Sequence, residues 1–335
     1  MLYRAGFLLW LACLALPAQA EWYSRDEAIM GTAIRVELWH DDDDAAARAA
    51  MAAVMEEMHR IDRAMSPYKD DSELSRINRE AADKTLTISQ EMADILARAI
   101  EFSVLSDGAF DITFSSVGYL YDYRRHLKPT EEQIAARLSG INYRHLRLDR
   151  NQRTLHFVRR GVRIDLGGIA KGWAVDRSIE LLKARGIAHA SVTAGGDTRL
   201  LGDRRGRPWN VGVRDPRQPA RMAVVLPLRD TAISTSGDYE RFFEVDGVRH
   251  HHIINPKTGK SPSGVRSVTV LAPDATTTEG LTKSVFIKGP VEGLRLIDSL
   301  KNVDAIVIDS QGEVHVSSGL QAMMTPAIKP NAPHR

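Results

Sequence analysis

The chain has almost no cysteine. Its single one, Cys13, lies in an apolar run near the N-terminus of a sequence of 335 residues. A disulfide framework and a cysteine-based zinc site are therefore excluded, and stability must come from packing. Charge of one sign is not in large excess either, because the formal net charge is +2 and basic and acidic residues are interspersed. This balance gives no indication of a nucleic-acid partner.

Long apolar runs are also absent beyond the first 20 residues. There, Arg4 precedes an apolar stretch from Gly6 to Leu16, and Ala18-Gln19-Ala20 follows it as the small-x-small pattern of a secretory cleavage site. The stretch is shorter than the roughly 20 residues that span a bilayer. The pattern therefore predicts a secretory signal peptide and no membrane-spanning helix in the mature chain.

Two consequences follow for domain organisation. We expect residues 1–20 to be removed and residues 21–335 to form one mature domain in the periplasm. Anchoring as a lipoprotein through Cys13 is less favoured, because Trp10 stands where such signals prefer leucine.

The remaining chain alternates strand and helix patterns without a strict βαβ rhythm, which predicts an α+β fold with antiparallel sheet pieces and packed helices, with two lobes around a cleft as an option. The segments expected are a strand over 34–38, a helix from the acidic run 41–44 to Met65, a helix from Ser89 to the Asp107-Gly108 exit, a helix with a capping box at Thr130 and Gln133, a hairpin around 150–152, a strand over 162–166, a helix over 169–185 and a strand over 303–308.

Several stretches carry chemistry. The loop IDLGGIAKG, residues 164–172, joins an expected strand to a helix N-terminus through two glycines and supplies Asp165 and Lys171. Backbone N–H groups in such loops bind phosphate, although this is neither a Walker A nor a GxGxxG loop. A tight turn without a ligand is the alternative for the glycine pair.

The stretch RHHHIINPKTG contains three consecutive histidines, His250 to His252. Neighbours on a strand point to opposite faces, so all three cannot converge on one metal ion. A polar wall of a cleft is favoured over a zinc or copper site. The clusters AGGD, residues 194–197, and STSGDYERFF, residues 234–243, offer glycines, hydroxyls and acids for a polar ligand, or ordinary turns.

The stretch TTTEGLTKS, residues 276–284, has two interpretations. Thr276 and Glu279 have the spacing of a capping box, and Glu279 and Lys283 are placed for an i,i+4 ion pair on a helix. A second interpretation comes from comparing this stretch with the sequence pattern of a known family, given below.

Eight segments, in order, resemble the ApbE family of FAD:protein FMN transferases over nearly the whole mature chain. They are MGTAIRVEL, SPYKDDSELSRIN, GAFDIT, IDLGGIAKGWAVD, AGGD, STSGDYERFF, HHIINPKTG and APDATTTEGLTKSVFIKG. The resemblance implies a T-fold-related α+β domain around an FAD cleft. It also implies an exported enzyme that cleaves FAD with the help of magnesium, attaches FMN through a phosphoester to a threonine of a membrane redox protein, and releases AMP.

The resemblance assigns roles by position. Met30 would pack on the isoalloxazine and Tyr68 on the adenine, while Asp165 and Lys171 would contact FAD, with Lys171 near the pyrophosphate. The other implied residues are Ala109, Phe110 and Asp111 holding the cofactor, His252 and Ile253 lining the flavin side, and the Gly168 carbonyl as a metal ligand. A carboxylate or His252 would take the proton of the attacking threonine hydroxyl.

The last segment departs from the family pattern A-D-A-L-A-T, whose Asp and Thr bind magnesium. Glu279 and Lys283 stand at these two positions. Glu279 keeps the carboxylate, with Gly280 beside it for backbone latitude, but Lys283 has no lone pair for a metal and would repel a cation. Our hypothesis is that Lys283 directs its charge at the pyrophosphate, with Glu279 orienting it or acting as base. In the alternative, Lys283 points to solvent and pairs with Glu279, and metal binds elsewhere or not at all.

Three functions follow for comparison. The favoured one is a flavin transferase. The resemblance implies that its acceptor is a D-x-[ST]-[GS]-[AS]-T segment of an Rnf, Nqr or nitrous-oxide-related electron-transfer protein. An FAD pyrophosphatase would pass the same phosphorus to water and give FMN and AMP. A non-catalytic accessory protein would bind FAD and deliver it to a redox complex.

Overall fold

The computed structural model describes residues 21–41, 44–218 and 221–324. The predicted signal peptide, Cys13 included, lies outside these residues. None of the helices described is both long and apolar enough to cross a bilayer.

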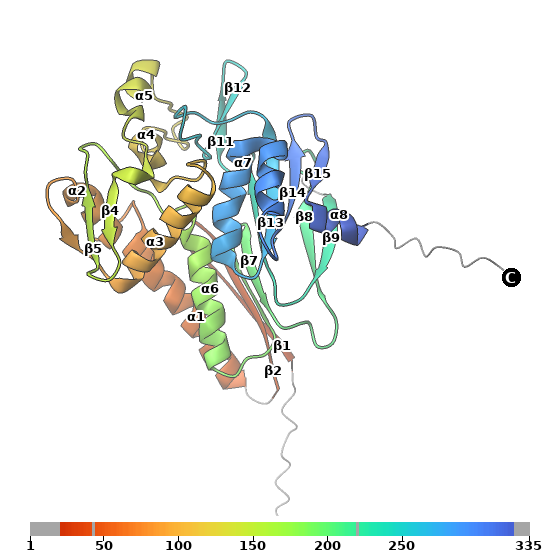
Figure 1. Cartoon of the computed structure of the whole chain (residues 1–335). Helices are drawn as coiled ribbons and strands as arrows, with labels where there is room; N and C mark the ends of the chain where they lie inside the picture. Colours follow the sequence, from red (N-terminus) through yellow and green to blue (C-terminus); the bar gives the residue numbers. More distant parts are fainter. Residues whose placement is uncertain (1–20, 42–43, 219–220, 325–335) are drawn as a thin grey trace, which may run out of the picture.

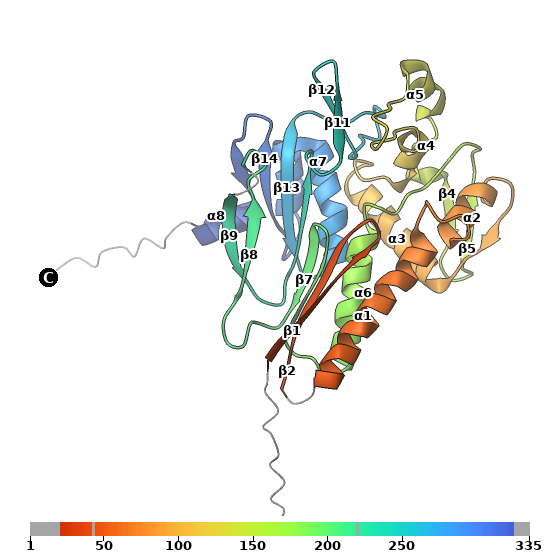
Figure 2. The same cartoon turned by 180° about the vertical axis from the view of Figure 1, so that it is seen from behind.

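An eight-stranded antiparallel sheet is the largest feature of the fold. Its order is β1-β2-β6-β7-β10-β13-β14-β15 (Figures 1 and 2). The strands are β1 Glu21–Ile29, β2 Thr32–His40, β6 Ala190–Ala194, β7 Asp197–Leu201, β10 Ala232–Gly237, β13 Val265–Ala272, β14 Asp304–Asp309 and β15 Val314–Val316. The predicted alternation over 34–38 is confirmed, because Ile34, Val36 and Leu38 are fully buried on one side of β2.

Three helices cover one face of this sheet. They are α1 Asp44–Met65, α6 Ala170–Ala184 and α7 Ala275–Asp298. α6 packs between α1 and α7, and Figure 1 shows the three side by side. Non-helical backbone at Gly289, before Pro290, interrupts α7. The predicted helices over 44–65 and 169–185 are confirmed.

A second group of shorter elements lies at one end of the three helices (Figure 1). It contains α2 Glu73–Glu80, β3 Leu86–Thr87, α3 Gln90–Leu105, η1 Ile112–Phe114, α4 Ser115–Gly118, α5 Glu131–Leu138, η2 Tyr143–His145, β4 Leu146–Asp149 and β5 Thr154–Phe157. Ser89 caps α3, Thr130 and Gln133 form the predicted capping box, and β4 and β5 form the predicted hairpin.

Two further hairpins and a last helix complete the fold. β8 Trp209–Arg214 pairs with β9 Met222–Leu228 and packs near α8 Ser318–Met324, while β11 Phe242–Val245 pairs with β12 Val248–His251. The β11–β12 hairpin projects beside α4 and α5 (Figure 1). Phe243 of β11 joins Val117 of α4 and Ile134 of α5 in a small core of their own.

Two local predictions are wrong. Residues 162–166 are extended but not a strand, because the backbone N–H and C=O of Ile164 bond to the Asn78 side chain and not to a neighbouring strand. The capping box at Thr276 and Glu279 does not form. Asp274 is the N-cap of α7, and its side chain accepts the Thr277 N–H.

Candidate functional site

The N-terminal halves of α6 and α7 meet next to the start of β7, and this junction brings four charged side chains together. Gly172 makes the contact possible: a Cβ added there would lie 2.3 Å from the Ala275 carbonyl oxygen of α7. Lys171 of α6 therefore faces Glu279 of α7 directly.

Lys171 lies between two carboxylates. Its ammonium donates to Asp197 Oδ2 at 2.6 Å and to Glu279 Oε1 in a very short contact. Burial acts against the charged form, but the charges of Asp197 and Glu279 and their hydrogen bonds raise the pKa of Lys171 overall. Lys171 is therefore a cation held between these two carboxylates.

Glu279 is fully buried and uses both oxygens. Oε1 faces Lys171 and also lies 3.5 Å from the Lys283 ammonium, while Oε2 accepts the Gly172 N–H at 2.8 Å. The carboxylate thus closes the N-terminus of α6, where negative charge is favourable. It links two helices and two ammonium groups.

Lys283 does not point to solvent, since only 17% of its side chain is exposed. A Cβ added at Gly168 would lie 3.9 Å from Cγ and Cε of Lys283, so the lysine stem runs beside this glycine. Burial lowers the pKa of Lys283, as does the charge of Lys171, while Glu279 opposes the shift. The solvent-facing alternative for Lys283 is wrong, although its pairing with Glu279 is present.

These residues do not fit a magnesium ion. Magnesium takes oxygen ligands in a near-octahedral arrangement, and an ammonium supplies no lone pair. Lys283 stands beside both predicted metal-binding positions, Gly168 and Glu279, and the Glu279 oxygens are bonded to Lys171 and Gly172. A divalent cation placed there would compete with Lys171 and meet a second positive charge.

His252 lies just beyond β12, and the charges of this cluster contribute to its pKa. Burial lowers its pKa to about 3, with further contributions from Lys283, His251, Arg241 and Lys171. Its Nδ1 is buried and makes no hydrogen bond within the part of the chain described. The imidazole is therefore neutral near pH 7, and one of its ring nitrogens has no hydrogen-bond partner among the described residues.

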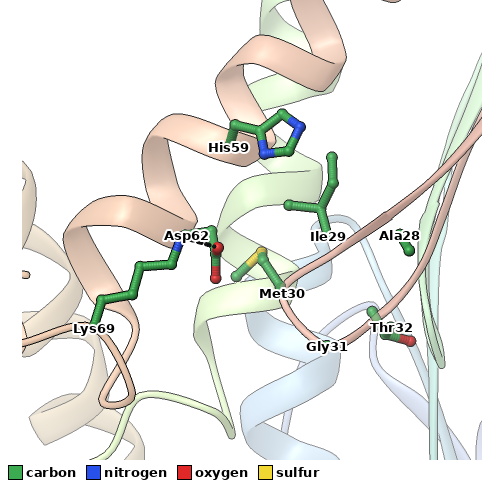
Figure 3. Close-up of a pocket in the computed structure, with 8 residues that line it drawn as sticks. All are labelled: Ala28, Ile29, Met30, Gly31, Thr32, His59, Asp62 and Lys69. Carbon is green, nitrogen blue, oxygen red and sulfur yellow. Dashed lines mark ion pairs between the residues drawn. The ribbon is translucent and has the colours of Figure 1, made fainter.

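Met30 occupies the tight turn between β1 and β2 with a left-handed backbone, φ 55°. Figure 3 shows its side chain between this turn and α1, in a cavity of about 470 Å³ that also has His59, Asp62 and Lys69 on its walls. Lys69 pairs with Asp62 at 2.8 Å there. A cavity of this size is within the usual range for small-molecule sites.

Tyr68, Asp165 and Arg241 lie close enough to one another to interact electrostatically. Tyr68 is 88% exposed, so its ring is free to stack on a ligand. The Asp165 carboxylate accepts the Gly167 N–H at 2.6 Å and shapes the loop before α6. Arg241 donates to the Gly31 carbonyl beside Met30, which brings the Met30 turn and the Tyr68 side of the site together.

The GAFD segment has mainly a structural role in the part described. Phe110 is buried edge-to-face against Phe102, and Ala109 is buried. Both oxygens of Asp111 bond inside the protein, to Thr113 and to the Tyr143 N–H, and burial raises the pKa of Asp111. Asp111 thus positions its loop through both carboxylate oxygens.

The other histidines do not form a metal centre with His252. His251 is buried with its Nε2 at the Pro262 carbonyl, and His250 packs against Phe243. Ile253 is buried in the main core. Within the residues described, the group of side chains that could hold a metal is a different one, Asp309, Glu313 and His315 on the β14–β15 hairpin. There, one Asp309 oxygen accepts the backbone N–H of Glu313 and the other bonds to His315 Nε2 at 2.9 Å.

Sequence reasoning missed two members of the site. Asp197 and Arg241 lie in the AGGD and STSGDYERFF segments, which were noted as polar clusters without a role for either residue. Asp197 meets Lys171 because β7 lies beside α6, and that proximity depends on the sheet order.

Comparison with known proteins agrees with this geometry. The profile of the ApbE family matches residues 30–307. An FAD:protein FMN transferase of Treponema pallidum is 32% identical over 95% of this chain and 94% of its own, and one of Vibrio cholerae is 32% identical over 81% and 82%. The crystal structure of the ApbE protein from Thermotoga maritima superposes with a TM-score of 0.84 at 31% identity, covering 91% of this chain and all of that one. The chain belongs to the ApbE family.

Proposed function

We propose that the protein is an FAD:protein FMN transferase. It cleaves FAD, attaches FMN through a phosphoester to a threonine of a membrane-associated redox protein, and releases AMP. The observation that carries this proposal is the junction of α6 and α7, where Lys171 and Lys283 share Glu279 next to the neutral His252. Relatives that align over most of the chain carry the name of this activity.

The reaction needs positioned charge more than covalent chemistry by the protein. The acceptor threonine Oγ forms a bond to the phosphorus of the FMN half, and the bridging P–O bond to the AMP half breaks, with its electron pair leaving on AMP. The ammonium groups stabilise the negative charge of the pyrophosphate. The threonine proton passes to His252, whose Nδ1 has no partner in the structure described.

Binding of FAD would use both sides of the site. The Met30 cavity takes the isoalloxazine ring, where a thioether makes favourable contacts with an aromatic face. The exposed Tyr68 ring stacks on the adenine. Lys171, Lys283 and Arg241 provide the positive charge between them for the pyrophosphate.

The protein acts in the periplasm, after removal of residues 1–20. The acceptor is a membrane redox protein of the Rnf, Nqr or nitrous-oxide-related type that carries a D-x-[ST]-[GS]-[AS]-T segment. Support for the location comes from the sequence pattern of a cleavable signal.

The test mixes the purified protein, FAD and a candidate acceptor domain, and follows the acceptor mass and the AMP released. An increase equal to FMN on the threonine, absent from an acceptor with Thr→Ala at that position, is expected. Release of FMN and AMP without any labelled acceptor would replace the transferase with a pyrophosphatase. Tight FAD binding without release of AMP would indicate an accessory flavin-binding protein.

A His252→Gln variant sharpens the test. The amide keeps a similar polar shape but cannot accept the hydroxyl proton as imidazole does, so transfer should slow by about 10²-fold or more while FAD affinity changes little. Equal loss of FAD affinity and of transfer would assign His252 to binding and not to proton transfer.

A further inference from the structure

The unusual feature of the site is one carboxylate shared by two ammonium groups. Lys171 and Lys283 both face Glu279 Oε1, and Lys171 has a second carboxylate, Asp197, at 2.6 Å. Lys171 is therefore neutralised twice within the protein, whereas the ion pair described for Lys283 is the longer one, 3.5 Å to an oxygen already held by Lys171.

The Lys283 ammonium is thus less fully paired within the protein than that of Lys171, so it is the better placed of the two to bind an added anion. An ammonium has three N–H donors and no acceptor. Its stem runs beside Gly168, in the loop that leads into the N-terminus of α6, so its head lies where a phosphate bound by that loop would be. Its side chain is 17% exposed, so it is not fully closed off from solvent.

We infer that the Lys283 ammonium takes the place of a divalent cation at this site, so that the protein binds the FAD pyrophosphate without metal. The inference rests on the proposed function, because FAD is taken as the ligand. In this arrangement Glu279 is not a metal ligand. It holds Lys171 and Lys283 at the start of the two helices and is itself fixed by the Gly172 N–H.

The charges support this assignment. The cluster contains two ammonium groups and two carboxylates, Asp197 and Glu279, so a bound dication would leave it strongly positive beside Lys283. A pyrophosphate brings the negative charge instead, and it would favour the charged form of Lys283 against the effect of burial. Anion binding and the lysine charge therefore support each other.

The first experiment measures FAD affinity of the purified protein by calorimetry, in EDTA and in excess Mg²⁺, together with its metal content. For the natural sequence we expect the two dissociation constants to agree within about threefold, and no stoichiometric metal. A large loss of FAD affinity in EDTA that Mg²⁺ restores would overturn the inference.

Two substitutions at one position separate charge from metal. Lys283→Met keeps an unbranched stem but removes the ammonium, so FAD affinity should fall by roughly tenfold or more, and Mg²⁺ should not restore it. Lys283→Thr supplies a hydroxyl oxygen in place of the ammonium, so FAD affinity should fall in EDTA and recover, at least in part, with Mg²⁺. Lys288→Met, on the same helix, is the matched control and should behave as the natural protein does.

The outcomes distinguish the inference from the proposed function. Metal-independent FAD binding that needs Lys283, without transfer to any acceptor, would support the inference and refute the transferase proposal. Unchanged FAD affinity in folded Lys283→Met would overturn the inference even if transfer proceeds. Thermal melts of each variant show whether it is folded.

Discussion

At the scale of single residues, the contacts of Glu279 explain the length of its side chain. Sequence comparison with the family pattern presents a glutamate as one methylene too long for its task. In the structure the carboxylate bridges Lys171 on one oxygen and the Gly172 N–H on the other, both on a different helix. The neighbouring Gly280 is explained by packing, since a Cβ there would lie 2.7 Å from the Phe102 ring.

His252 leads to a prediction about pH. Its pKa is about 3 in the folded protein and near 6.5 for an unperturbed histidine, so between these values the unfolded chain binds the proton and the folded chain does not. Its contribution to stability is fully present above pH 6.5 and is lost as the pH falls. At pH 5 this amounts to roughly 2 kcal/mol of lost unfolding free energy.

The measurement is urea unfolding of the natural protein and of His252→Gln at pH 7.5 and pH 5. The drop in unfolding free energy between the two pH values should be smaller in the variant by about 2 kcal/mol. His126→Gln, at an exposed histidine, controls for the loss of one imidazole. An identical drop in natural protein and His252→Gln would contradict the burial of a neutral imidazole.

At the scale of elements, the start of α7 shows what sequence can and cannot give. The spacing of Thr276 and Glu279 predicted a capping box, but the N-cap is Asp274, two residues earlier. The choice depends on α6, because Asp176 accepts the N–H groups of both Ala275 and Thr276. Such a partner, far away in sequence, is invisible to local capping rules.

The residues of the site also divide into those that local sequence predicts and those that depend on contacts between distant segments. Glu279 and Lys283 were paired from helical spacing alone, and that pairing is present. The resemblance to the family placed Lys171 near the pyrophosphate, and its contact with Glu279 is seen only in the structure. Asp197 and Arg241 were not placed. The position of Asp197 depends on the sheet order, and that of Arg241 on a contact between the β1–β2 turn and the segment after β10. Local periodicity carries no information about either.

The close approach of α6 and α7 gives a second prediction. Gly172→Ala would put a Cβ 2.3 Å from the Ala275 carbonyl oxygen and 2.9 Å from the Thr276 nitrogen, both backbone atoms that cannot swing away. The helices must separate, which should cost about 1–3 kcal/mol and disturb the contact between Lys171 and Glu279. Thermal unfolding and FAD affinity should therefore both fall.

Gly264→Ala is the matched control for this substitution. No atom lies within 4 Å of a Cβ added there, and the backbone is not in the left-handed region. Its stability should be unchanged or slightly increased, by up to about 1 kcal/mol, because the unfolded chain loses freedom. Equal melting temperatures for Gly172→Ala and Gly264→Ala would show that the α6–α7 contact tolerates a side chain.

At the scale of the whole molecule, the residues that follow the predicted signal peptide form part of the main sheet. β1 starts at Glu21 and pairs with β2 along its full length. Trp22 of β1 packs edge-on against Trp39 and Trp209, with ring centres 5.6 and 5.1 Å away. β1 also leads into the Met30 turn. The strand next to the predicted cleavage point is thus joined both to the sheet and to the site.

This arrangement predicts two different results for two truncations. A chain that begins at Glu21 should keep the melting temperature and FAD affinity of the protein secreted after processing, because it retains β1, Trp22 and the Met30 turn. A chain that begins at Thr32 should be less stable and bind FAD poorly, because β2 becomes an exposed edge and part of the Met30 cavity is lost. Intact mass of the secreted protein locates the cleavage, and calorimetry compares the two chains. Full FAD affinity in the chain beginning at Thr32 would contradict the assignment of Met30 to the flavin site.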